Sequence, residues 1–182
     1  MNLAPTAQSP WQPPPVDRRP TLSLNEWAVL AVLVEQPRHG YDVAAELAPT
    51  APLGRVWTLS RQLVYRALER LVALGYAEPR RTEAGNQGPP RTVHGATRRG
   101  RTELQRWLLQ PVEHLRDVRG PLLVKLVLLE RLGVNRAPLV EAQRAAFEPL
   151  LERWASRPAE RDVIARWRYH SAASVAAFLA DL

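Results

Sequence analysis

Residues 60–75 carry the sequence SRQLVYRALERLVALG, which has the pattern of one amphipathic helix with a start and a stop signal. Ser60 can accept hydrogen bonds from the free N–H groups of the first turn, and Gly75 can adopt the left-handed conformation that ends many helices. Apolar side chains recur at helical spacing and predict one buried face, made of Leu63, Val64, Ala67, Leu68, Leu71 and Leu74.

The opposite face of this helix is polar and mostly cationic. It carries Arg61, Gln62, Tyr65, Arg66, Glu69 and Arg70. Guanidinium, amide and phenol groups are the ones that contact the phosphates and base edges of DNA. Taken alone, the pattern fits an ordinary surface helix with a solvated basic face at least as well. The segment that follows favours the DNA-reading interpretation.

Two short extended segments after Gly75 predict a β-hairpin. They are residues 76–81 and 91–94, and the run between them, residues 85–90, is rich in glycine and proline. Three arginines lie on these segments: Arg80, Arg81 and Arg91. A helix followed by a basic hairpin is the order of a winged helix-turn-helix, in which the helix enters the major groove and the wing lies along the backbone.

The remaining chain is predicted to be helical. Ser23 and Glu26 have capping-box spacing before an apolar run, residues 27–34, that indicates a helix buried on nearly all sides. Further helices are expected over about 41–47, from residue 97 to Pro111, over 112–132, over 136–155 with a kink or break at Pro149, and from Pro158 onward. We therefore predict a mainly α fold: an N-terminal winged helix-turn-helix with a two-stranded β wing, then an all-α C-terminal region.

Composition limits the classes of function. The chain has 182 residues, a formal net charge of +7, 46% hydrophobic residues and no cysteine. The charge favours a polyanionic partner, nucleic acid first, although an arginine-rich codon usage would explain part of it. Without cysteine, disulfides, thiolate catalysis and cysteine-based zinc sites are excluded. No apolar run is long enough to span a bilayer and no signal pattern is present, so a cytoplasmic protein is expected.

Several motifs together resemble the PadR family of transcriptional regulators, in its longer form with a helical C-terminal region like that of AphA. The matching stretches are residues 24–30 with His39-Gly40-Tyr41, residues 63–68 with Leu71 and Gly75, Gly88-Pro89-Pro90-Arg91 with Thr97, Gly100, Leu104 and Trp107, and residues 122–126. The resemblance covers about residues 22–182. His94 and Ala96 depart from the family, which usually has Tyr and Leu there, so the contacts of the wing are left open.

The expected organisation follows from this resemblance and from the patterns above. Residues 1–21 are a disordered, proline-rich tail, residues 22–110 the DNA-binding domain, and residues 111–182 a dimerisation and effector domain. The expected DNA-binding residues are Arg61, Gln62, Tyr65, Arg66, Arg70, Arg80, Arg81 and Arg91. Arg61 and Gln62 lie in the first turn, the part of a recognition helix nearest the bases. For His39-Gly40-Tyr41 we expect a structural turn with Tyr41 packed beneath it.

The helices after residue 112 are expected to form a homodimer, because their apolar stripes exceed what one compact chain hides. The dimerisation residues are Leu122, Leu126, Leu129, Ile164 and Phe178. Two-fold symmetry would present two recognition helices to a palindromic operator. The family resemblance further implies a small aromatic effector, for which Trp27, Trp107, Trp154 and Trp167 are candidate stacking surfaces. Packing in the core or at a dimer contact is the competing explanation for each tryptophan.

Two other functions are weighed. Catalysis is disfavoured because His39, His94, His114 and His170 are scattered and no phosphate loop is present, so we expect no enzyme, no metal and no cofactor. A winged helix that docks a protein instead of DNA is the alternative, since fold alone does not settle function. The cationic helix face favours duplex DNA. The effector, the operator sequence, the regulated gene and the sign of regulation stay open.

Overall fold

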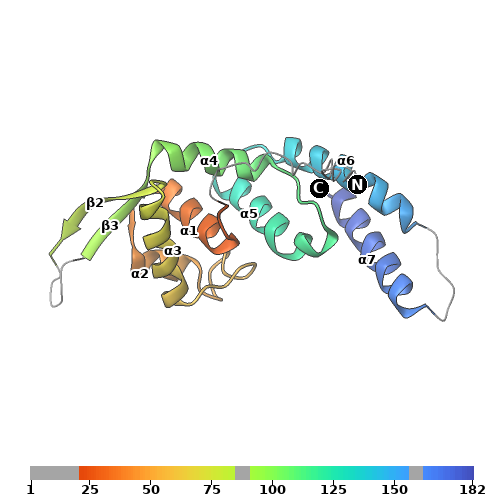
Figure 1. Cartoon of the computed structure of the whole chain (residues 1–182), viewed down its shortest axis with the longest axis horizontal. Coiled ribbons are helices and arrows are strands. Elements are labelled where there is room, and N and C mark those ends of the chain that lie inside the picture. Colours follow the sequence, from red (N-terminus) through yellow and green to blue (C-terminus); the bar gives the residue numbers. More distant parts are fainter. Residues whose placement is uncertain (1–20, 85–90, 156–161) are drawn as a thin grey trace, which may run out of the picture.

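The computed structural model describes residues 21–84, 91–155 and 162–182. The proline-rich tail over residues 1–20, the glycine-proline run of the hairpin and Pro158 lie outside these ranges. The described chain is mainly helical with one small antiparallel sheet, as predicted. Along the longest axis, the hairpin of β2 and β3 lies at one end and α7 at the other, with α1 to α5 between them (Figure 1).

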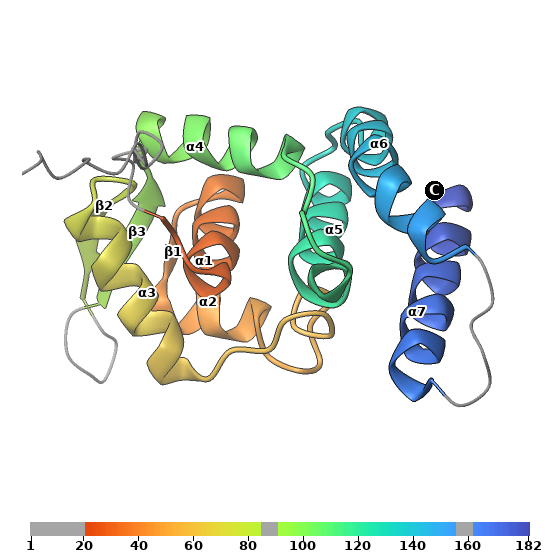
Figure 2. The same ribbon diagram turned by 45° about the vertical axis from the view of Figure 1, so that its right-hand side comes forward.

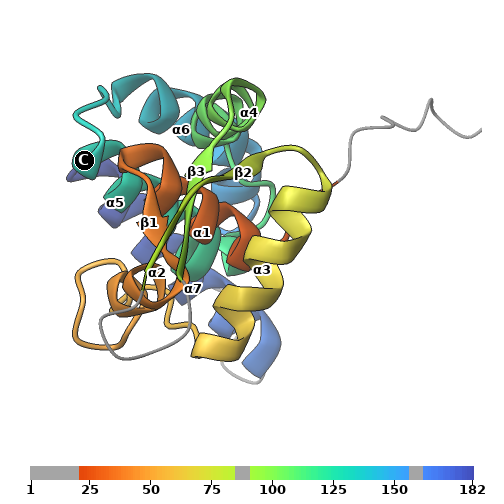
Figure 3. The ribbon, with the colours of Figure 1, turned by 90° about the vertical axis from the view of Figure 1, so that its left-hand side faces the viewer.

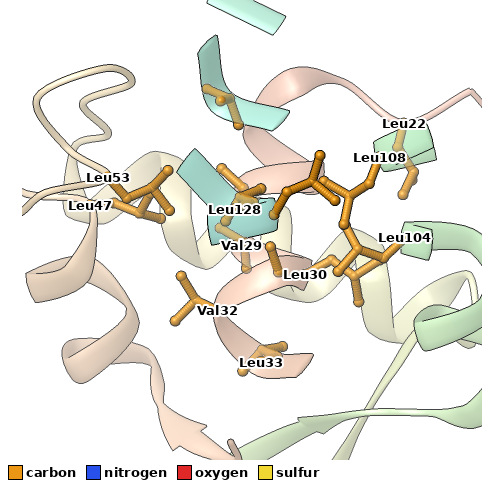
Figure 4. Close-up of a cluster of buried hydrophobic side chains, with 14 of the residues drawn as sticks. Leu22, Val29, Leu30, Val32, Leu33, Leu47, Leu53, Leu104, Leu108 and Leu128 are labelled. Carbon is orange, nitrogen blue, oxygen red and sulfur yellow. The ribbon is translucent and has the colours of Figure 1, made fainter. Parts of the chain in front are cut away.

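Helix α1, Leu24–Glu35, is the centre of the core. Its capping box forms as predicted: the backbone N of Ser23 donates to Oε2 of Glu26 at 2.6 Å, and the N of Glu26 donates to Oγ of Ser23 at 3.4 Å. Residues 28–33 are all fully buried. Figure 4 shows why, because Leu47 and Leu53 lie on one side of α1 and Leu104 and Leu108 on another.

Three helices surround α1: α2, Gly40–Glu46; α3, Arg61–Ala73; and α4, Arg98–Leu109 (Figure 2). Helix α3 confirms the prediction for residues 60–75. Oγ of Ser60 accepts from the N of Leu63 at 3.4 Å, and Gly75 ends the helix with φ of 70°. Val64, Ala67, Leu68 and Leu71 are buried, whereas Leu63 is exposed and was wrongly placed on the buried stripe.

The sheet has three strands in the order β1-β3-β2, all antiparallel. The hairpin of β2, Ala77–Glu83, and β3, Arg91–Ala96, is the predicted wing. The third strand is the two-residue β1, Arg38–His39, which pairs with β3. In β2 the register shifts between Pro79 and Arg81, so Arg80 is an extra, bulged residue. A bulge suits a strand in which proline offers no N–H to the ladder.

The connection after α4 differs from the continuous helix predicted over residues 112–132. A 3₁₀ turn, η1 (Leu115–Asp117), and a π-helical turn, η2 (Val118–Leu122), precede α5, Leu123–Arg131. Pro121 lies inside η2 and has no N–H to donate, which interrupts the regular α-helical ladder. At Gly120 this turn lies close to the loop before α3, where an added Cβ would be in ordinary contact with the Trp57 ring at 3.4 Å.

Helices α6, Ala137–Arg153, and α7, Val163–Ala180, pack on each other beyond α5. Of the kink or break expected near residues 145–149, a break does not occur, because α6 continues through Pro149 to Arg153. Ala145 and Pro149 are both exposed, so water can satisfy the carbonyl that proline leaves without a donor. Arg144 on α6 binds the end of α7, because its Nε donates a hydrogen bond to the carbonyl of Leu179 at 2.9 Å.

The predicted dimerisation stripe needs correction. Leu122, Leu126 and Leu129 are buried within the chain itself, in the core that extends from α1. Phe178 is half-buried against the same core. Of the five residues, only Ile164 is largely exposed. The sequence pattern correctly identified these leucines as apolar positions that become buried. It did not show that the same chain buries them, in place of a second copy.

None of the helices in the described ranges is both long and apolar enough to cross a membrane.

Candidate nucleic-acid interface

The polar face of α3 is open to solvent. Figure 3 shows α3 beside the wing strands on the side of the molecule that faces the viewer. Arg61, Gln62, Tyr65, Arg66 and Arg70 are all exposed, as predicted. The opposite face of α3 packs against α1, α2 and β2, which fixes the position of the helix. The structure therefore places these side chains together on a rigid element.

Some of these side chains already have a partner. The guanidinium of Arg61 lies 5.0 Å from the centre of the Tyr41 ring, and Nε of Arg70 lies 3.7 Å from Oε1 of Glu26. Within the described ranges, no hydrogen bond or ion pair engages the side chains of Gln62 and Arg66. Gln62 and Arg66 can thus meet a ligand without breaking an existing contact.

The wing arginines divide into two kinds. Arg80 pairs with Glu78, Nη1 to Oε1 at 2.9 Å, and its Nη2 donates to the carbonyl of Ala96 at 3.2 Å. Arg81 pairs with Glu83, Nε to Oε1 at 2.6 Å. Arg91 is exposed and has no such pairing with a described residue. The sequence pattern pointed to all three alike, but two of them have their charge offset by neighbouring glutamates.

Glu83 also joins the wing to β1. Nε2 of His39 lies 2.9 Å from Oε2 of Glu83. The hydrogen bond from Arg81, and after it the one from His39, hold the pKa of Glu83 below its usual value. Glu83 is therefore a carboxylate whose two oxygens are both engaged at neutral pH.

A concavity of about 840 Å³ lies between α2, α3 and β3. It is lined by His39, Gly40, Tyr41, Tyr65, Arg91, Thr92 and His94. Burial lowers the pKa of His94 below its usual value. Tyr41 is 56% exposed, so the expectation that it packs beneath a turn is wrong. The sequence analysis recognised the His-Gly-Tyr motif but did not predict that His39 and Tyr41 would line a concavity.

An ion-pair network lies near the end of α1, where Glu35 is located. Arg131 of α5 binds Glu35 through Nε and Nη2, both at 2.7 Å, and Glu46 through Nη2 at 2.9 Å. Arg38 binds Glu46 as well, at 2.9 Å. Burial acts to raise the pKa of Glu46, but the hydrogen bond from Arg131 and the charges of Arg38 and Arg131 outweigh it and lower the pKa. The network joins α1, β1 and α2 to α5.

The four candidate tryptophans do not gather at one place. Trp27 and Trp107 stack on each other, with ring centres 4.9 Å apart and planes 10° from parallel. Nζ of Lys125, a buried residue, lies 4.7 Å from the centre of the Trp107 ring and donates to the carbonyl of Gln110. Burial lowers the pKa of Lys125 to about 8. The guanidinium of Arg168 lies 5.0 Å from the centre of the Trp154 ring, whereas Trp167 is 72% exposed.

His39 and His94 line the concavity together, whereas His114 precedes η1 and His170 lies on α7. Across the described ranges, no three His, Asp or Glu side chains are placed to hold a metal ion.

Residues 29–106 match the model of the transcriptional regulator PadR-like family. The matched segment runs from within α1 to within α4 and so contains helix α3, the residues that line the concavity and both strands of the hairpin. The sequence motifs of this segment indicated a resemblance to the same family, and the match to the family model confirms that resemblance.

A curated relative and two solved structures are similar to the chain. The probable transcriptional regulator Rv1176c of Mycobacterium tuberculosis is 32% identical over 94 residues, which are 51% of this chain and 48% of the relative. The chain thus spans about half the length of the relative. PadR of Bacillus subtilis in complex with operator DNA has 17% identity and a TM-score of 0.49, over 89% of this chain and 93% of that one. The same protein with p-coumaric acid has 17% identity and a TM-score of 0.41, over 87% and 92%.

Proposed function

We propose that this protein is a sequence-specific DNA-binding transcriptional regulator. The observation that carries the proposal is the exposed face of α3, where Gln62 and Arg66 stand free of described partners between the cations Arg61 and Arg70. An arginine presents a planar fork that matches guanine, and an amide matches adenine. Similarity to the PadR-like family supports the same function.

The regulator acts as a homodimer on a palindromic operator. The first turns of α7 expose Val163, Ile164 and Trp167, with exposed fractions of 75%, 65% and 72%. Contiguous apolar side chains of this size mark a contact surface. A second copy is the occupant we infer, because a two-fold pair would also present two α3 helices to successive turns of one duplex.

Repression that responds to a small aromatic molecule completes the proposal. Trp167 offers an uncovered ring, whereas Trp27 and Trp107 cover each other and Arg168 lies over Trp154. An aromatic effector stacking at Trp167 would lie in the same surface as the inferred dimer contact, so binding of the two would be coupled.

The alternative function is protein docking by the winged helix without specific DNA binding. It requires a recognition face that suits a protein partner. Cations on α3 with no described acid opposite Arg66 favour a polyanion instead.

The test is selection of duplexes from fragmented genomic DNA, followed by titration of the best duplex at several salt concentrations. We expect an inverted repeat and an affinity that falls steeply with salt. Arg66→Ala should cost about 1–3 kcal/mol of binding free energy on the selected duplex. Arg153→Ala is the matched control, an exposed arginine near the end of α6. No enrichment and no salt-dependent binding would favour the docking alternative.

A second measurement separates the wing arginines. Neutralising Arg91 should lower the salt slope by about one unit, because an unpaired guanidinium can bind a phosphate directly. Arg80→Gln and Arg81→Gln should each lower the slope by less, since Glu78 and Glu83 already offset these charges. Equal effects of all three changes would show that the ion pairs within the wing open when DNA binds.

A further inference from the structure

Hydrogen-bond donors line the concavity beside α3. Its walls come from β1 and the start of α2, from α3 and from β3, which lie side by side in Figure 3. The seven lining residues include two phenols, a guanidinium, a hydroxyl and two imidazoles, and no carboxylate. Walls of this composition favour an anionic occupant that accepts hydrogen bonds.

The phenols of Tyr41 and Tyr65 have no hydrogen bond to another residue in the described ranges, and both rings are about half exposed. The guanidinium of Arg61 lies over the ring of Tyr41 at 5.0 Å, which steadies this ring and adds positive charge at the rim. Two free hydroxyls therefore face solvent at one concave place, beside two cations, Arg61 and Arg91.

Gly40 makes this arrangement possible. A Cβ at Gly40 would lie 2.7 Å from Cε1 and 3.0 Å from Cζ of Tyr65, closer than real Cβ atoms approach. Only a residue without a side chain lets the Tyr65 ring lie against the first residue of α2. The order His39-Gly40-Tyr41 thus has a physical reason: glycine admits one phenol from α3, and the next residue supplies the second.

The charge of the concavity is positive. The carboxylate in contact with its lining is that of Glu83, which binds Nε2 of His39 and is also bound by Arg81 at 2.6 Å. This pairing offsets the charge of Glu83, while Arg91 has no such partner among the described residues. An anion entering the concavity would meet no uncompensated negative charge from these groups.

We infer that this concavity, the tyrosine pocket, holds one phosphate group of the DNA backbone between the recognition helix and the wing. The hydroxyls of Tyr41 and Tyr65 and the guanidinium of Arg91 donate to the phosphate oxygens. The inference rests on the proposed DNA-binding function and assigns a direct role to Tyr41, in place of the structural turn expected from the sequence. Contacts of this kind set the register of a protein on the duplex without reading bases.

The first experiment removes single hydroxyls. Tyr41→Phe and Tyr65→Phe should each weaken binding to the selected duplex about three- to tenfold, the range of one hydrogen bond. The loss should be the same for duplexes of unrelated sequence, because the contact is to the backbone. Tyr169→Phe makes the same chemical change on α7, away from the pocket, and should leave affinity unchanged. Thermal unfolding of each variant checks that the fold is intact.

The second experiment removes single phosphate charges. Neutral methylphosphonates are placed one at a time along the selected duplex. At one position in each half-site, the substitution should weaken the native protein but cause little further loss in the Tyr41→Phe/Tyr65→Phe variant, because both changes remove the same contact. Independent, additive losses at every position would overturn the assignment.

Inorganic phosphate shares the chemistry of a DNA phosphate, so a third arm compares phosphate with chloride at equal ionic strength. Phosphate should compete with DNA more strongly for the native protein than for the double phenylalanine variant. Competition without coupling to any methylphosphonate would mean that the pocket takes free phosphate only, against the proposal. If Arg66→Ala weakens DNA binding while both tyrosine variants bind normally, the pocket assignment fails and the regulator function stands. If the native protein binds no DNA, both fail.

Discussion

Helices α1 and α7 are both apolar, yet their surroundings differ completely. Helix α1 contacts α2, α3, α4 and β3, and six consecutive residues on it, 28–33, have no exposed surface. Helix α7 packs on α6 and η1, and the residues that it buries fully are Ala172 and Leu179. Its first turns leave Val163, Ile164 and Trp167 in solvent, at the end of the molecule opposite the wing (Figure 1).

The difference shows that an apolar helix indicates burial but not the partner that provides it. The core of this chain is complete around α1, because every face of that helix is covered by a neighbouring element. At the start of α7, no described element of the same chain covers the apolar side chains. Apolar side chains on α1 should therefore contribute to folding, and those on the start of α7 to association.

The largest expected effect tests the first half of this comparison. Leu30→Ala removes a fully buried side chain from the middle of α1 and should lower the free energy of unfolding by about 2–5 kcal/mol, because a cavity remains. Val163→Ala makes a similar truncation on exposed α7 and should change it by less than about 0.5 kcal/mol. Urea unfolding at low protein concentration measures both. Comparable losses would mean that α7 is part of the folding core.

The second effect concerns association. Ile164→Asp/Trp167→Asp places two charges on the exposed face of α7 and should weaken self-association about 30-fold, or about 2 kcal/mol, because an interface must then desolvate carboxylates. Sedimentation velocity over a concentration series follows the dimer, and circular dichroism should stay unchanged. A native protein that remains a monomer at micromolar concentration would remove α7 from the dimer proposal.

The third effect lies at the edge of the α1 core, where Lys125 sits over Trp107, which stacks on Trp27 of α1. Since folding lowers its pKa from 10.5 to about 8, the unfolded chain binds more protons between these pH values. Stability should rise by up to roughly 3 kcal/mol as pH increases through this window, and the penalty should be complete below about pH 8.

Lys125→Met is the matching control for that measurement, because it keeps the volume and removes the charge. Its unfolding free energy, measured in urea over the same pH range, should lack the rise that the native chain shows. An identical pH dependence in both proteins would mean that other groups are responsible.

The smallest effect compares the two helix starts. Ser23→Ala removes the capping box of α1, and Asp162→Ala removes the side chain that accepts from the N of Ala165 at the start of α7. The first should cost about 1 kcal/mol of stability. The second should cost less, because an end exposed to solvent frays with little loss elsewhere. A larger loss at Asp162 would show that the start of α7 is more firmly held than its exposure implies.

Local signals predicted much of the fold. Ser23 with Glu26, Ser60 and Gly75 set the ends of α1 and α3, because caps and left-handed residues act within a few positions of the chain. Strand β1 was not predicted, since two residues carry no alternation and their partners lie on β3, far along the sequence. The turns η1 and η2 were not predicted either, although the proline that interrupts the helix there, Pro121, is visible in the sequence.

The candidate site was predicted in part. The exposed cationic face of α3 follows from helical periodicity alone. The pairing of Arg80 and Arg81 with glutamates depends on strand geometry, and Tyr41 and Tyr65 line one concavity only because α2 and α3 pack together. Whether Leu122, Leu126 and Leu129 are buried within the chain likewise depends on how α5 packs against the other helices. Periodicity shows which face is apolar, and only the tertiary structure shows which element covers it.

Lys125 is the single lysine of the sequence, since every other basic side chain apart from histidine is arginine. Its amine is enclosed between α4 and α5, against Trp107. Lys125 is therefore the only side-chain amine that an amine-directed acylating reagent can modify, and we expect modification only when α5 separates from α4. The rate of that modification, followed by mass spectrometry, would measure how often α4 and α5 separate in an otherwise folded protein. Beside it, the Trp27–Trp107 pair would report the same event through its fluorescence.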